Sequence, residues 1–176
     1  MTKVSATSYT YSWTAPAGNG TQTFALATGT DIAGNVITAV PTSGATITVD
    51  NIAPTISSVS PTASSFVNHT QVSYTLSEAI ASGTITWTRT GGTADATVHT
   101  QSLTGSELAT GAHSNITLTN NPPLVDGAIY TVAFDATDAA GNVAAQVSST
   151  SVTYDTTAPT NENTVFTSAN TVQGSL

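Results

Sequence analysis

The heptapeptide TDAAGNV at residues 137–143 has a near copy, TDIAGNV, at residues 30–36, an offset of 107 residues. A second pair of segments follows, because VDNIAPT at residues 49–55 recurs as YDTTAPT at residues 154–160, an offset of 105 residues. Two landmarks in the same order at nearly the same offset indicate an internal repeat. The sequence therefore predicts a repeat of about 105 residues.

The phase of this repeat divides the chain into three predicted parts. Residues 1–52 hold the C-terminal half of one repeat, residues 53–156 hold a complete repeat, and residues 157–176 hold the N-terminal strand region of a further repeat. Each junction carries Ala-Pro-Thr, and proline fixes φ and favours an extended linker.

The complete repeat reads as seven short strands separated by clusters of turn residues. The predicted strands are residues 56–60, 71–76, 84–90, 97–103, 115–119, 129–134 and 147–154, and residues 105–110 form the only predicted helical turn. In the first partial repeat, strands are expected at residues 7–14, 21–27 and 45–49. Short strands at this spacing predict an all-β sandwich with Greek-key connections.

Three motifs together resemble a known family. DAAGN at residues 138–142 is followed by a predicted strand and by DTTAPT at residues 155–160, and YTLSE at residues 74–78 precedes them. This combination resembles the bacterial Ig-like repeats of large surface adhesins, and the resemblance covers nearly the whole chain. It implies tandem Ig-like β-sandwiches at the bacterial cell surface, in an extracellular array that calcium often stiffens.

Charge and composition exclude several classes of function. The chain has ten acidic residues against two Lys or Arg residues, a net charge of −8 and no cysteine. Without a basic cluster, nucleic-acid binding is not expected, and without cysteine there are no disulfides or thiolate–zinc sites. No apolar run reaches the length of a membrane span. Acidic side chains without basic partners instead suggest a divalent cation.

The length of the last strand indicates where calcium could bind. About 13 residues separate Asn142 from Asp155, which is about 40 Å of extended chain, so Asp155 lies at the far end of its domain. The loop of residues 135–142 should then face the preceding linker. Calcium takes six to eight oxygen ligands. We expect a Ca²⁺ site at this junction with the ligands Asp50, Glu78, Asp135, Asp138 and Asn142.

Three further residues are secondary candidates. Asp155 would serve the following junction, and Asp31 with Asn35 would serve the preceding one. The alternative is purely structural, because Asp and Asn side chains stabilise tight turns and Gly-Asn accommodates positive φ.

The sequence contains no motif typical of an enzyme. No nucleophile–base arrangement, phosphate-binding loop or histidine-rich metal motif is visible. His69, His99 and His113 are isolated in the sequence, and solvated positions are expected for all three. Trp13 and Trp87 lie in alternating patterns and are expected to anchor cores. We therefore expect a protein without catalytic activity.

The predicted function is that of a structural or adhesive repeat module. Residues 157–176 carry the opening strand region that residues 1–52 lack, so copies could join head to tail into a filament by strand complementation. The alternative is that the partial repeats belong to a longer array. A second class of function is a ligand-binding adhesin domain that recognises a glycan or a protein through its end loops.

Overall fold

The regular structure is almost entirely β. The computed structural model describes residues 2–4, 9–10, 12–14, 17–24, 32–36 and 45–160. The strands are β1 (Thr2–Lys3), β2 (Tyr9–Thr10), β3 (Gly20–Thr23), β4 (Thr46–Val49), β5 (Ile56–Ser60), β6 (Phe66–Val67), β7 (Val72–Leu76), β8 (Ser82–Gly92), β9 (His99–Ser102), β10 (Gly111–Ile116), β11 (Ala128–Thr137) and β12 (Val147–Tyr154). One 3₁₀ turn, η1 (Gly105–Leu108), confirms the predicted helical turn.

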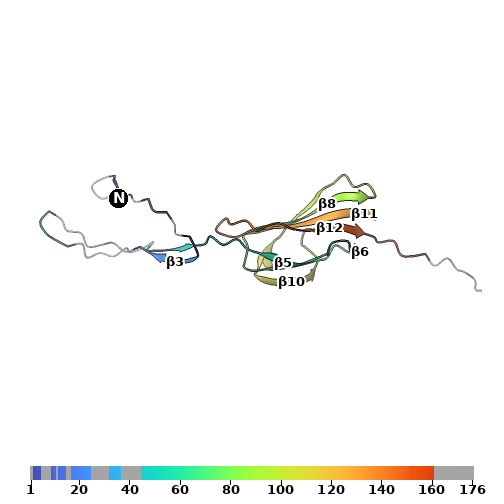
Figure 1. The fold of residues 1–176 in the computed structure, drawn as a ribbon, viewed down its shortest axis with the longest axis horizontal. Helices are drawn as coiled ribbons and strands as arrows, with labels where there is room; N and C mark the ends of the chain where they lie inside the picture. Colours follow the sequence, from blue (N-terminus) through green and yellow to red (C-terminus); the bar gives the residue numbers. More distant parts are fainter. Residues whose placement is uncertain are drawn as a thin grey trace, which may run out of the picture.

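The strands from β5 to β12 form two sheets. One has three strands in the order β10-β7-β5, and the other has five in the order β6-β12-β11-β8-β9. All pairs are antiparallel except β6 with β12, which run parallel. The chain crosses repeatedly between the sheets. The two sheets form two layers that run along the length of the domain (Figure 1). The predicted Ig-like β-sandwich is confirmed.

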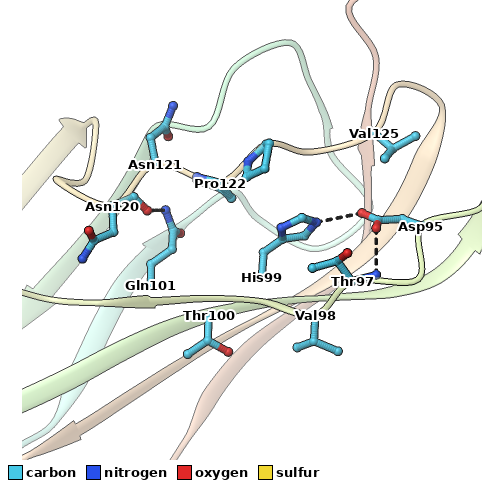
Figure 2. Close-up of a pocket in the computed structure, with 11 residues that line it drawn as sticks. Asp95, Thr97, Val98, His99, Thr100, Gln101, Asn120, Asn121, Pro122 and Val125 are labelled. Atoms are coloured by element: carbon cyan, nitrogen blue, oxygen red, sulfur yellow. Dashed lines mark hydrogen bonds and ion pairs between the residues drawn. The ribbon is translucent and has the colours of Figure 1, made fainter.

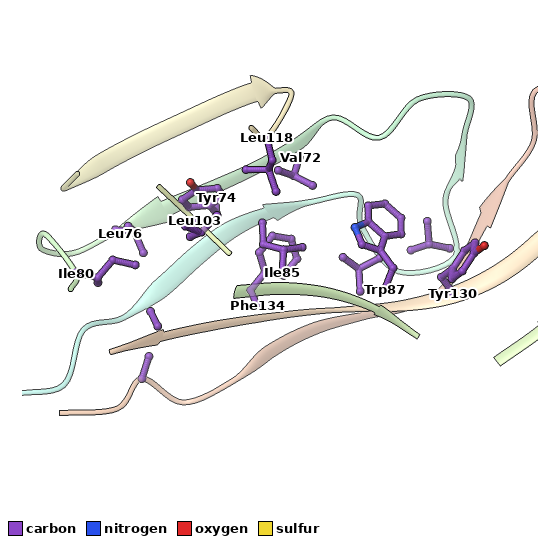
Figure 3. Close-up of a cluster of buried hydrophobic side chains, with 14 of the residues drawn as sticks. Val72, Tyr74, Leu76, Ile80, Ile85, Trp87, Leu103, Leu118, Tyr130 and Phe134 are labelled. Atoms are coloured by element: carbon purple, nitrogen blue, oxygen red, sulfur yellow. The ribbon is translucent and has the colours of Figure 1, made fainter. Parts of the chain in front are cut away.

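The core lies between the two sheets because apolar side chains alternate along the strands. β7 buries Val72, Tyr74 and Leu76 on one face, and β11 buries every second residue of its length. Trp87 of β8 is completely buried and meets Tyr130 edge to face, with 6.0 Å between ring centroids (Figure 3). Full burial of one such side chain contributes about 1.5–3 kcal/mol.

The predicted strand at residues 115–119 is wrong, because β10 occupies Gly111–Ile116. The strand is irregular at Asn115, whose φ is +49°, and it ends at Ile116. Beyond that point the backbone N–H of Thr119 donates to the Glu107 carboxylate at 2.9 Å instead of pairing with β7. A side chain on η1 therefore draws the chain away from the sheet.

Glu107 is a buried acidic group that organises the crossing between the sheets. Its carboxylate accepts hydrogen bonds from the N–H groups of Thr104 and Thr119 at 2.7 and 2.9 Å, and its backbone oxygen accepts one from the Tyr74 hydroxyl at 2.8 Å. Burial acts to raise the pKa of Glu107, but the bonds from Thr119 and Thr104 outweigh it and lower that pKa. Glu107 therefore stays ionised as a structural anchor.

The described parts of residues 1–52 form two small sheets. β1 pairs with β2, and β3 pairs with β4 as an antiparallel ribbon. The predicted strands at 7–14 and 21–27 extend partly over residues outside the described ones. Trp13, expected in a core, is 39% exposed and packs edge to face on Phe24. Among the described residues, no helix has the length and apolar character that crossing a bilayer requires.

Candidate metal centre

Three carboxylates from distant parts of the sequence meet where the linker enters the complete domain. Asp50 follows β4, Glu78 follows β7, and Asp138 follows β11. One carboxylate oxygen from each lies within 4.8 Å of the others. Asp50 and Glu78 are half-buried and Asp138 is buried. The two sheets of the sandwich thus each contribute one acid, and the linker contributes the third.

A tight turn fixes the position of Asp138. Its Oδ1 accepts hydrogen bonds from the N–H groups of Ala140 and Asn142, both at 2.8 Å. Gly141 has φ +93°, a conformation that glycine adopts without strain. Burial acts to raise the pKa of Asp138, but the bonds from Asn142 and Ala140 outweigh it and lower that pKa. The carboxylate is therefore held ionised.

Asn142 ties the linker to this turn. Its Nδ2 donates to Asp138 Oδ2 at 2.8 Å and to the backbone oxygens of Asp50 and Ile52 at 3.1 and 3.4 Å. In this arrangement Asn142 contacts its neighbours through its nitrogen, so it positions oxygens instead of supplying one. The side chain of one loop thus holds together a carboxylate and two carbonyls from different segments.

The cluster is electrostatically unfavourable on its own. Two like charges 4 Å apart repel by about 1 kcal/mol in water and by about 4 kcal/mol near a protein surface. Arg89, one of two basic residues in the chain, is engaged elsewhere, by the backbone oxygens of Thr93 and Gly92. Carboxylate and backbone oxygens are the ligands that Ca²⁺ prefers. The donor set therefore fits a hard divalent cation.

Asp135 does not join the three carboxylates. β11 continues to Thr137, so Asp135 lies within the strand and not in the loop where the sequence placed it. Side chains alternate across a sheet, and Asp135 faces away from buried Phe134 and Ala136. Both of its carboxylate oxygens accept from Gln146 Nε2, at 2.9 and 3.0 Å.

The secondary candidates lie apart from the cluster or outside the described residues. Asp31 is outside them, and Asn35 is exposed. Asp155 is exposed after β12, at the end of the domain opposite Asp138. Its Oδ1 accepts from the Thr157 N–H at 3.0 Å, the same local turn that Asp50 makes with the Ile52 N–H at 3.2 Å.

A side chain from the preceding turn holds each linker. Asn19 Oδ1 accepts from the Asn51 N–H at 2.8 Å. At the exit of the complete domain, Asp126 Oδ1 accepts from the Thr156 N–H at 2.6 Å, and its Oδ2 accepts from the Thr157 hydroxyl at 2.8 Å. We call these two groups of contacts, the one made by Asn19 and the one made by Asp126, the linker clamps. Sequence reasoning missed both, although Asn-Gly and Asp-Gly occupy matching places in the repeat.

Sequence reasoning also missed a buried polar cluster near the exit end. The side chains of His99 and Asp95 are only 8% and 5% exposed, with 2.8 Å between His99 Nε2 and Asp95 Oδ2. The Tyr130 hydroxyl donates to the same oxygen at 2.7 Å. The bonds from Tyr130 and His99 lower the pKa of Asp95 to about 2. The prediction that His99 is solvated is wrong, because a turn after Asp95 folds the carboxylate over the ring.

Comparison with known families identifies the class of domain. The chain matches the family described as Bacterial Ig-like domain over residues 50–156. Because that match spans more than half of the chain, the chain belongs to this family. The matched segment includes all three clustered carboxylates. Comparisons with curated proteins and with solved structures give no significant match. Domains of this family occur in bacterial surface proteins.

Proposed function

We propose that this protein is a structural spacer of a bacterial surface protein, acting outside the cell, and that Ca²⁺ bound between repeats fixes their relative orientation. Its role is extension and cohesion, without catalysis. Family membership supports the surface location. The proposal that Ca²⁺ binds rests on the geometry of the junction between the linker and the following domain.

One observation carries the calcium proposal. Asp50 belongs to the linker, whereas Glu78 and Asp138 belong to two different sheets of the following domain, and their oxygens lie within 4.8 Å of one another. A cation bound to all three would join the linker to the sandwich. Metal removal would restore the repulsion among the three carboxylates and loosen the junction.

Thermal unfolding of the whole chain tests this proposal. Melts are recorded with excess EDTA, with millimolar CaCl₂ and with MgCl₂ as a control for ionic strength. Calcium at a hundredfold excess over its Kd stabilises the folded state by about 2.7 kcal/mol. A midpoint that is the same in EDTA and in calcium, together with unchanged small-angle scattering, would rule the site out.

We extend this proposal to the assembly of several copies of the chain head to tail. The β3–β4 ribbon has mostly exposed residues, including Ile47 at 37%, and Trp13 and Phe24 nearby are also partly exposed. An isolated two-stranded ribbon is marginally stable in water. Strands from a second copy, supplied by residues 157–176, would cover it. Size-exclusion chromatography decides the matter, because a monodisperse monomer over a wide concentration range contradicts assembly.

A further inference from the structure

A groove with both polar and apolar lining residues lies at the side of the sandwich, away from the metal centre. It has a volume of about 640 Å³, within the range of ligand-binding pockets. Its floor is β9, and its opposite wall is the loop before β11, which carries Asn120, Pro122 and Val125 (Figure 2). The groove is independent of the proposed calcium site, because it lies toward the end of the domain from which the chain leaves.

His99 presents an acceptor to this groove. Its Nε2 contacts the Asp95 carboxylate, which the Tyr130 hydroxyl also binds. Asp95 is ionised and accepts, so Nε2 carries a hydrogen, and when the ring carries only this one hydrogen its Nδ1 is an acceptor. Among the described residues Nδ1 has no hydrogen-bond partner, and no buried side-chain nitrogen or oxygen lacks one. Nδ1 therefore keeps some contact with solvent, on a ring that lines the groove.

Gln101 forms the inner wall of the groove beside this acceptor. It lies two residues further along β9, on the same buried face, about 6–7 Å from His99. Its Oε1 accepts from Trp87 Nε1 at 3.1 Å, and its Nε2 donates to the backbone oxygen of Asn120. These bonds determine the orientation of the amide, and Gln101 is only 2% exposed, so it supports the inner wall of the groove and His99 alone offers a ring nitrogen to a ligand.

The charges in the groove exclude an anionic ligand. Among the described residues that line it there is no Lys or Arg, and Asp95 is the single acidic one. Asp95 Oδ1 accepts from the Thr97 N–H at 2.9 Å, while its Oδ2 serves Tyr130 and His99. The carboxylate is thus fully engaged by its own neighbours. A ligand of this groove should therefore be uncharged, forming hydrogen bonds beside the apolar surface of Pro122 and Val125.

An extended peptide is a poorer fit than a sugar. Strand addition needs the free backbone of β9, but Asn120 Nδ2 already donates to the backbone oxygen of Ser102 at 3.3 Å. A sugar offers hydroxyl groups that donate and accept, and C–H groups that pack on apolar surface. From this geometry we infer that the His99–Gln101 groove is a binding site for a neutral saccharide, with a hydroxyl group of the sugar donating to His99 Nδ1.

The test is an NMR titration of the whole chain in EDTA, so that the proposed calcium site does not contribute. The probes are glucose, galactose, mannose and N-acetylglucosamine. At least one sugar should shift the amide signals of residues 97–101 and 120–125 in a saturable manner, and those of Glu78 and Asp138 should not move. The Nδ1 signal of wild-type His99, read in long-range ¹H–¹⁵N spectra, should move with the same titration curve.

Two matched variants complete the test. His99→Phe keeps a ring but removes the acceptor, and it should weaken sugar binding about tenfold, as expected for one lost hydrogen bond. His113→Phe is the control, because His113 stacks on Tyr74 on the other sheet. The proposal is overturned if no sugar shifts the groove signals, if the His99 Nδ1 signal stays fixed, or if a mixture of extended peptides binds the groove where sugars do not.

Discussion

The side-chain oxygen of Asn19 accepts a hydrogen bond from the backbone N–H of Asn51 at 2.8 Å, across 32 residues of sequence. Asn51 also donates from its Nδ2 to the backbone oxygen of Gly18 at 2.9 Å. The turn before β3 therefore holds the linker one residue beyond Asp50. A cation at Asp50 would bind a segment whose direction the preceding turn already restricts.

Removal of the exit linker clamp should loosen the linker while leaving the sandwich folded. In Asp126→Ala, the Thr156 N–H loses its acceptor, so its hydrogen exchange should accelerate at least tenfold while the melting midpoint barely changes. Asn19→Ala is the matched control and should accelerate exchange at the Asn51 N–H but not at the Thr156 N–H. Unchanged exchange at Thr156 would show that Asp126 does not hold the linker.

The exit clamp should also open in acid. The bonds from Thr156 and Thr157 lower the pKa of Asp126 below its ordinary value of 3.8. A lowered pKa means that the clamp is fully present above about pH 4 and is lost as the pH falls through the folded-state pKa. Exchange at Thr156, measured from pH 6 downward and corrected for intrinsic rates, should rise only below pH 3.8.

Glu78→Gln should change stability in opposite directions with and without calcium. In EDTA the substitution removes repulsion with Asp50 and Asp138 and should stabilise the fold by about 1 kcal/mol. In calcium it removes a ligand and should abolish most of the calcium-induced rise in midpoint. Asp135→Asn is the control, because Asp135 pairs with Gln146 outside the cluster. If Glu78→Gln and Asp135→Asn reduced the calcium-induced rise in midpoint equally, the proposed ligand set would be contradicted.

Glu107→Ala should destabilise the sandwich by about 2 kcal/mol or more, because the hydrogen bonds that the N–H groups of Thr104 and Thr119 donate to an ionised carboxylate are lost. The pKa of Glu107 is lowered from its ordinary value of 4.5. Its contribution is therefore present above that pH and is lost as the pH falls through the folded-state value. Urea unfolding from pH 7 to pH 3 checks this, since the difference in the free energy of unfolding between wild type and variant should become smaller in acid.

Gly92→Ala should cost about 2 kcal/mol or more, because Gly92 has φ +64° and an added Cβ would collide with the backbone oxygen of Gly127. Gly91→Ala is the control, since an added Cβ there meets only the Ile129 side chain at 3.5 Å, an ordinary contact. Urea unfolding of both variants measures the difference. Equal stability of the two would show that the turn at Gly92 adapts without strain.

The sequence contained enough information to predict the sandwich and to predict that the three clustered acids lie at the same end of the domain. Alternation of apolar residues in β7 and β11 specified which faces meet, and the length of the last strand placed the Asp138 loop beside the linker that carries Asp50. Asp135 was misplaced because the predicted end of β11 fell three residues short, at 134 instead of Thr137. In a strand, one residue of register decides which face a side chain occupies.

The His99 cluster and the linker clamps were beyond single-sequence reasoning for a different reason. Asp95 and His99 are four residues apart, which in an extended strand would separate them by about 13 Å. They meet because the Asp95 carboxylate caps the Thr97 N–H and bends the chain. Asn19 and Asn51 meet only because β3 pairs with β4. Such contacts follow from tertiary geometry, which a local pattern does not contain.

The parallel pairing of β6 with β12 has a consequence for a protein under tension. The chain enters at the Asp138 end and leaves beyond Tyr154, so a pull on both linkers draws β6 and β12 in opposite directions along their length (Figure 1). The bonds that join residues 66–67 to residues 153–154 are then loaded in shear, all together and not one after another. Shear loading of this kind should make the domain resist a pulling force far better than its modest strand pairing suggests. Single-molecule pulling should show it, with Val67→Pro, which removes a backbone donor at this pairing, lowering the unfolding force.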